Sequence, residues 1–148
     1  MNEIERLLAI EEIQQLKAKY FYGLDTHDWD LWRREVWAPE ARLEVPELGS
    51  SVEGRDALAD WVAERSANQV SVHHGHTPII ELTSDTTATG LWAMEDRLYR
   101  PKDHPDHADG AFILGFGHYR ETYVKLDVGW RIATTLLTRL RVTRQRVF

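Results

Sequence analysis

The chain of 148 residues has no cysteine, five prolines, nine glycines and no long apolar run. Without cysteine, disulfides, thiolate metal sites and cysteine nucleophiles are all excluded. Glycine and proline are too few for a collagen-like or low-complexity chain. No stretch approaches the roughly 18 apolar residues that span a membrane, so we expect no membrane partner. Residues 1–5 are acidic and lack the apolar region of a signal peptide, so we expect a cytoplasmic protein.

An excess of positive charge is also missing. The formal net charge is −6, from 24 acidic and 18 basic residues. An acidic domain repels phosphate backbones, so we expect no nucleic-acid partner. The local exception is a group of arginines near the C-terminus, which we interpret as a solvated or subunit-contacting strand end: Arg139, Arg141, Arg144 and Arg146.

What the chain does have is aromatic surface, with six Trp, five Tyr and four Phe. Hydrophobic residues make up 43% and charged residues 28%, the balance of a soluble globular protein. The length fits a single domain over residues 1–148. The aromatic side chains then need a core, a ligand pocket or a subunit interface in which to be buried.

Apolar periodicity predicts helices in the first half of the chain and strands in the second half. Apolar residues three and four apart predict a helix over 4–24, with Asn2 as its N-cap. Further helices are predicted over 29–37 and 54–67, and strands over 41–45, 70–83, 87–99, 111–126 and 130–142. This order predicts an α+β fold, with the helices packed on one face of a curved, mainly antiparallel sheet.

Four segments in this order resemble one known family. They are 10–29 with its exit at Asp28-Trp29, 52–58 (VEGRDAL), 72–76 (VHHGH) and 129–132 (GWRI). Together they resemble the SnoaL-like group of the nuclear transport factor 2-like superfamily, and the resemblance covers essentially the whole chain. It implies a cone-shaped α+β barrel with three helices in the first half of the chain. The fold hosts many activities, so the resemblance alone does not select one.

Within that group the chain is most similar to scytalone dehydratase, bile acid dehydratase and lindane dehydrochlorinase, which share an Asp–His pair. The resemblance places this pair at Asp25 and His73 and adds Tyr20 and Asp96 as catalytic candidates. It also implies a polar or basic residue near the last strand, for which Arg139 is the candidate.

Each catalytic candidate has a second interpretation. His73 is poised as a base at neutral pH, and a carboxylate partner would orient its ring. Asp25 could instead cap the helix or be a solvated turn acid, and Tyr20 could be a core residue. Asp96, among apolar neighbours, could give or take a proton, or it could pair with Arg97 or with an arginine of the last strand.

The histidine cluster raises the question of a metal. On a strand, His74 and His76 share one face and His73 points to the other. A metal site would need further ligands, and the spacing of the nearby candidates His118, Glu121 and Asp96 selects none of them. We therefore expect no metal and no cofactor.

The aromatic residues are candidates for a pocket wall around a flat apolar ligand. The group is Phe21, Trp32, Trp61, Trp92, Phe112, Phe116 and Tyr119, of which we expect Phe21, Trp32, Trp61, Trp92 and Phe116 to bind substrate together with Arg139. The polar segment 102–109 is interpreted as a flexible rim with solvated histidines.

These features predict a cofactor-free lyase of dehydratase type that acts on a small apolar ring compound, such as a steroid, polyketide or terpenoid. His73 would be the base, Asp25 its orienting partner and Tyr20 the contact to the leaving group or a carbonyl. Asp96 would be a secondary acid or substrate contact. The alternatives are a ketosteroid-isomerase-like isomerase and a non-catalytic binding or assembly domain. We also expect a homo-oligomer, a trimer rather than a dimer.

Overall fold

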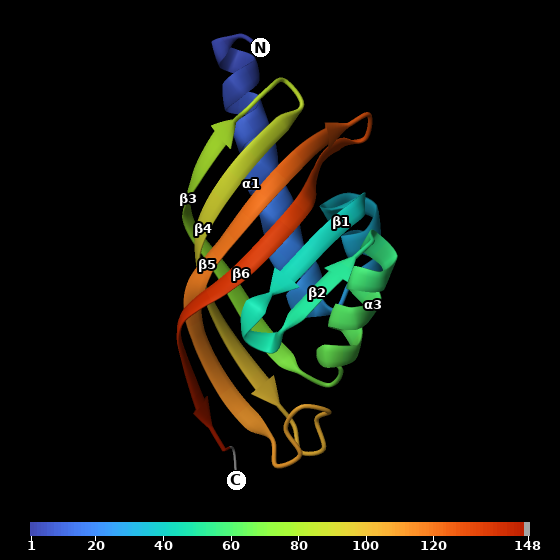
Figure 1. The fold of residues 1–148 in the computed structure, drawn as a ribbon, viewed down its shortest axis with the longest axis vertical. Coiled ribbons are helices and arrows are strands. Elements are labelled where there is room, and N and C mark those ends of the chain that lie inside the picture. The colour runs from blue at the N-terminus through green and yellow to red at the C-terminus, as the bar shows by residue number, and fades with distance from the viewer. Residues whose placement is uncertain (147–148) are drawn as a thin grey trace.

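The computed structural model describes residues 1–146, in which the helices pack against a curved sheet of six strands (Figure 1). The helical segments are α1 (Glu3–Thr26), α2 (Trp29–Leu31), the π-helix η1 (Trp32–Val36), the 3-10 turn η2 (Pro46–Leu48) and α3 (Arg55–Arg65). The strands are β1 (Trp37–Val45), β2 (Ser50–Glu53), β3 (Val70–Leu82), β4 (Thr87–Arg100), β5 (Ala111–Leu126) and β6 (Gly129–Gln145). The predicted α+β fold class is confirmed.

The sheet is open and mainly antiparallel, in the order β2-β1-β6-β5-β4-β3. Within residues 1–146, only β1 and β6 pair in parallel. The four long strands β3 to β6 bend together, and α1 runs behind them in Figure 1. The register of β3 shifts between His76 and Ile79, a stretch that contains Pro78. This curvature gives the sheet an inner face toward α1 and an outer face on the opposite side.

The edge of the sheet differs from the sequence prediction. β1 begins at Trp37 rather than at residue 41, and β2 occupies residues 50–53, for which no strand was predicted. Pro39 is tolerated because the pairing of β1 with β6 shifts register between Trp37 and Arg42. β2 has only four residues, with no buried side chain, and forms by pairing with β1. Such a short polar strand has no periodicity of its own to detect.

Helix α1 begins with a capping box and packs along the sheet for most of its length. The Asn2 side chain accepts a hydrogen bond from the Glu5 backbone N–H, and the Glu5 carboxylate accepts one from the Asn2 backbone N–H. His27, in the left-handed region at φ 58°, caps the C-terminal end. The predicted apolar stripe is exposed at Ile4 and Leu7, half-buried at Ile10 and buried from Ile13 onward. Among the described residues no helix is long and apolar enough to cross a membrane.

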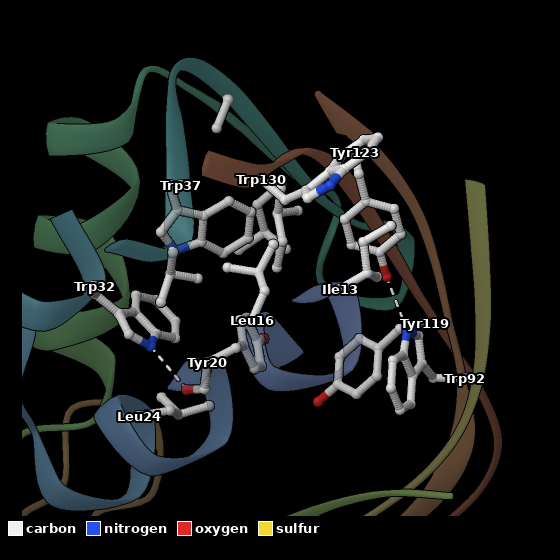
Figure 2. Packing of buried hydrophobic residues seen from close by; sticks show 14 of the residues in the cluster. Ile13, Leu16, Tyr20, Leu24, Trp32, Trp37, Trp92, Tyr119, Tyr123 and Trp130 are labelled. Atoms are coloured by element: carbon white, nitrogen blue, oxygen red, sulfur yellow. Dashed lines mark hydrogen bonds between the residues drawn. The ribbon is translucent and has the colours of Figure 1, made fainter. Parts of the chain in front are cut away.

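The core holds a dense aromatic cluster between α1 and the sheet (Figure 2). The Trp32 ring stacks on Tyr20 with centroids 5.0 Å apart, and its Nε1 donates to the Tyr20 carbonyl at 2.8 Å. The Trp92 Nε1 donates to the Tyr123 hydroxyl at 2.8 Å. Buried indole and phenol groups usually find such partners. Much of the aromatic content thus forms the core.

A buried ion pair also lies in this core, which the sequence did not indicate. The Lys17 Nζ lies 2.6 Å from Glu121 Oε1, and both side chains are almost fully buried. The Tyr123 hydroxyl donates to Glu121 Oε2 at 2.5 Å and the Thr135 hydroxyl donates to Oε1 at 3.1 Å. Burial lowers the pKa of Lys17, while the charge and hydrogen bond of Glu121 oppose that shift. The ion pair is therefore tied to the core by several hydrogen bonds.

We predict that Lys17→Met destabilises the protein by about 3–5 kcal/mol, because it leaves the Glu121 carboxylate buried without its partner. Adding Glu121→Gln should recover much of that loss. As a matched control, Lys19→Met breaks the exposed pair Lys19–Glu35 and should cost at most about 1 kcal/mol. Urea unfolding measures all three, and equal midpoints for Lys17→Met and wild type would contradict the prediction.

The loop between β4 and β5 is anchored by a histidine, contrary to the expectation of solvated histidines. The His104 side chain is buried, with Nε2 2.9 Å from the Arg65 carbonyl oxygen. Its Nδ1 accepts from the Asp106 backbone N–H at 3.1 Å, so Nδ1 carries no proton and Nε2 is the donor. Burial lowers the pKa of His104 below its ordinary 6.5. The neutral ring therefore ties this loop to the end of α3.

We predict that this loop loosens in mild acid. Because the folded-state pKa of His104 lies below 6.5, the unfolded chain binds more protons there, so stability falls as pH falls below 6.5. Hydrogen exchange at the Asp106 amide should accelerate in that range relative to the core strands. A His104→Gln variant should lack this additional pH dependence. If the wild type and this variant show the same pH profile, the prediction is wrong.

Candidate active site

Asp25 and His73 lie together, and the Asp25 carboxylate accepts three hydrogen bonds from β3, two from His73 and one from Ser71. The His73 Nδ1 is 2.6 Å from Asp25 Oδ1, and the His73 backbone N–H donates to Oδ2 at 2.9 Å. The Ser71 hydroxyl donates to Oδ1 at 2.8 Å. Since a carboxylate only accepts, Nδ1 carries the proton and Nε2 is unprotonated in the neutral ring. Asp25 thus fixes the orientation of the imidazole.

The local structure explains why these groups meet. Asp25 is in the last turn of α1, and the cap at His27 ends the helix immediately beyond it. Ser71 and His73 are two residues apart on β3, so both point to the inner face. The Asp25 side chain is 23% exposed and that of His73 is 9% exposed, so neither is a freely solvated group. Ser71 was not among the predicted site residues.

Asp96 and Arg139 lie on the Nε2 side of His73. Asp96 is the cross-strand partner of His73, and its Oδ2 is 4.0 Å from Nε2. Arg139 donates from Nη1 to Oδ1 at 2.8 Å and from Nη2 to Oδ2 at 2.5 Å, the bidentate geometry of an ion pair. Burial disfavours the charged guanidinium, but the hydrogen bonds and charge of Asp96 outweigh it and raise the pKa of Arg139. Of the two interpretations of Asp96, the structure shows the pair with a last-strand arginine.

A glycine on β5 makes room for this ion pair. Gly115 is the cross-strand partner of Asp96, and a Cβ at this position would collide with the Arg139 guanidinium and the Asp96 carboxylate. A glycine inside a strand often marks such a close approach. The Gly115-Phe116-Gly117 sequence was therefore a usable signal that sequence reasoning did not use.

Two buried tyrosines accompany the charged groups. Tyr20 and Tyr119 contact edge to face, with ring centroids 5.8 Å apart. Burial raises the pKa of both phenols, and the charges of Asp96 and other carboxylates add to the shift. At neutral pH both are therefore protonated hydroxyls. Tyr119 was expected only as one member of the aromatic group.

The predicted substrate-binding aromatics separate into different parts of the fold. Phe21 and Trp92 flank Gly75 on β3, where a Cβ would contact both rings. Trp32 is fully buried in the core. Trp61 is half-buried on α3. Phe116 lies on the outer face of β5, across from Glu95 and Arg141, apart from the Asp25–His73 pair.

His74, His76 and Glu95 gather on the outer face, with ligand atoms within 4.8 Å of one another. The acidic residues considered earlier as further ligands have other partners, since Glu121 binds Lys17 and Asp96 binds Arg139.

Solved structures with this fold include several of known or suggested activity. A hexachlorocyclohexane dehydrochlorinase, LinA type 2, matches with a TM-score of 0.84 and 16% identity, over 99% of this chain and 95% of that chain. A scytalone dehydratase-like protein from Novosphingobium aromaticivorans matches with a TM-score of 0.83 and 19% identity, over 99% and 94%. At these identities the likeness shows the fold alone.

Two further comparisons concern the family. Rv3472, a protein of unknown function from Mycobacterium tuberculosis, matches with a TM-score of 0.76 and 26% identity, over 91% of this chain and 78% of that chain. The SnoaL-like domain family matches residues 5–135, which is most of the chain. Together with the fold, this match shows that the chain belongs to the SnoaL-like domain family.

Proposed function

We propose that this protein is a cofactor-free lyase of dehydratase type with His73 as its base. The observation that carries the proposal is the Asp25–His73 pair, in which Nδ1 is bound by a carboxylate and Nε2 faces the Asp96–Arg139 ion pair. An imidazole held in this way has its unprotonated nitrogen available to take a proton from carbon. Two similar structures bear the names of eliminating enzymes, a dehydrochlorinase and a dehydratase.

In the proposed reaction His73 Nε2 removes a proton from a carbon next to the one that bears the leaving hydroxyl. The electrons of that C–H bond form the new C=C bond, and the C–O bond breaks. Asp25 stabilises the imidazolium that forms. His73 then gives its proton to the departing hydroxide, which leaves as water, and the enzyme returns to its starting state.

The remaining polar groups would position the substrate and stabilise charge. Tyr20 and Tyr119 remain protonated because burial raises their pKa, so they suit donation of hydrogen bonds to a leaving hydroxyl or a carbonyl. Arg139 adds positive charge near an oxygen that becomes negative. Asp96 accepts hydrogen bonds and holds Arg139 in place. The same donors would suit an isomerase, in which the proton is returned to another carbon and no water is lost.

The substrate class rests on the apolar surroundings of the inner face. Phe21 and Trp92 lie side by side at Gly75, two residues along β3 from His73. Flat aromatic side chains at this position favour a small apolar ring compound, such as a steroid, polyketide or terpenoid.

We further propose that the chain is one domain and forms a homo-oligomer. The outer face of the sheet exposes Ile79, Tyr99, Phe116 and Leu140, apolar side chains that a subunit interface would cover. A groove of about 470 Å³ on that face is lined by residues including Leu91 and Leu136. A second copy of the chain suits this surface, and the family resemblance favours a trimer.

We predict that His73→Ala and Asp25→Asn each lower kcat by about 100-fold or more, since acid–base catalysis contributes roughly that much. Hydroxylated ring ketones serve as the test panel, with mass spectrometry to detect loss of one water. His118→Ala, on the outer face of β5, is the control and should retain activity. Wild-type rates in both dyad variants would contradict the proposal, and a product of unchanged mass would indicate an isomerase.

We predict that Arg139→Lys lowers kcat by at least about tenfold, because lysine cannot make the bidentate contact to Asp96. Gly115→Ala should have a similar effect, since its methyl group would displace the Arg139 guanidinium. Arg141→Lys, an exposed arginine two residues along β6, is the matched control. If neither Arg139→Lys nor Gly115→Ala changes kcat, Arg139 has no role in the reaction.

A further inference from the structure

We propose that His74, His76 and Glu95 form a binding site for a divalent transition-metal cation such as Zn²⁺, Ni²⁺ or Cu²⁺. The site lies on the outer face of the sheet and is separate from the proposed active site. It does not depend on the proposed function, because none of the three side chains takes part in the elimination.

The backbone brings the three side chains to one point of the outer face. His74 and His76 are two residues apart on β3, so they project to the same side. Glu95 on β4 is the cross-strand partner of His74, and the partner of His76 is Ala93, whose small side chain leaves room. This register is not visible in the sequence, which is why Glu95 was not among the ligands considered.

The distances suit a single cation with modest side-chain movement. The His74 Nδ1 is 4.0 Å from Glu95 Oε1, and the His76 Nε2 is 3.4 Å from Glu95 Oε2. In a tetrahedral zinc site, bonds of about 2.0–2.1 Å place the ligand atoms roughly 3.3 Å apart. His76 and Glu95 are already at that spacing, and because all three ligand atoms lie within 4.8 Å of one another, no pair needs to approach by more than about 1.5 Å.

The donor set and its surroundings define the class of cation. Two imidazoles and one carboxylate are good ligands for Zn²⁺, Ni²⁺ and Cu²⁺, and poorer ligands for Mg²⁺ and Ca²⁺. The His74 and His76 side chains are 51% and 53% exposed, so water can complete the coordination. Arg97 lies 3.1 Å from Glu95 Oε1, but an exposed ion pair of this kind is weak and a dication can displace it.

The proposed metal site and the catalytic pair lie on opposite faces of the sheet, at neighbouring positions of β3 and β4. His73 pairs with Asp96 and His74 pairs with Glu95, in consecutive positions of the same two strands. The first pair faces inward and the second faces outward. A bound cation would therefore join β3 to β4 next to His73, and it should raise the melting temperature of the folded chain.

The test is calorimetric titration of the untagged, chelator-treated full chain with Zn²⁺ and with Ni²⁺. We expect one cation per chain, with His74→Ala and His76→Ala each weakening binding at least tenfold, about 1.4 kcal/mol. Glu95→Gln should weaken binding by several fold. The cation should raise the melting temperature of the wild type and not that of the His74→Ala/His76→Ala double variant.

Two further variants make the outcome decisive. His118→Ala removes an outer-face histidine on β5 and should leave the affinity unchanged, as should His73→Ala. If the double variant binds as tightly as wild type, or if His118→Ala weakens binding as much as His74→Ala, the proposed site is wrong. Loss of binding in His73→Ala with retention in His74→Ala would place the cation at the Asp25–His73 pair and overturn the proposal. None of these results depends on the enzymatic activity.

Discussion

The attachment of Asp25 to β3 is the interaction on which the candidate site depends. One carboxylate at the end of α1 accepts hydrogen bonds from Ser71, from the His73 backbone and from the His73 ring. Helix and sheet are thus joined at the residue that orients the imidazole. A carboxylate near a helix C-terminus is otherwise unfavourable, because the helix dipole places negative charge there. The hydrogen-bond donors on β3 offset that cost. A carboxylate at Asp25 is therefore explained by its contacts with β3 and not by the helix itself.

Around this attachment the inner face holds two ion pairs of different character. The Lys17–Glu121 pair is fully buried, and core hydroxyl groups donate hydrogen bonds to Glu121, so this pair belongs to the core. Asp96–Arg139 faces His73 and depends on the missing side chain at Gly115. The carboxylates of both pairs, Glu121 and Asp96, raise the pKa of Tyr20 and of Tyr119. The mostly apolar interior therefore contains two ion pairs, each with its own hydrogen-bond partners.

The sequence predicted the fold class and the long elements well, because a 24-residue amphipathic helix and strands of 13 to 17 residues have clear periodicity. It also placed Asp25 and His73 on elements that meet, through the family resemblance. It missed the short strand β2, whose pairing is tertiary. It gave no sign that Lys17 is buried, since lysine is almost never fully buried without a partner and Glu121 lies 104 residues away.

Cross-strand register accounts for the remaining differences. Alternation shows which residues of one strand share a face, but it does not show which residue of the next strand lies beside them. Glu95 therefore went unnoticed as the neighbour of His74. Phe116 was grouped with the inner aromatics, although its neighbours Gly115 and Gly117 are the inner-face residues of that stretch. Arg139 was named as a candidate, but its contact with Asp96 required the structure.

The central claim is that Asp25 holds His73 with the proton on Nδ1 and leaves Nε2 free to act as the base. Nitrogen-15 NMR of the His73 ring at neutral pH tests this claim directly. The expected spectrum shows a protonated Nδ1 and an unprotonated Nε2 in the wild type, and a loss of that preference in Asp25→Asn. A proton on Nε2 in the neutral wild-type ring, or the same tautomer in both proteins, would contradict the claim.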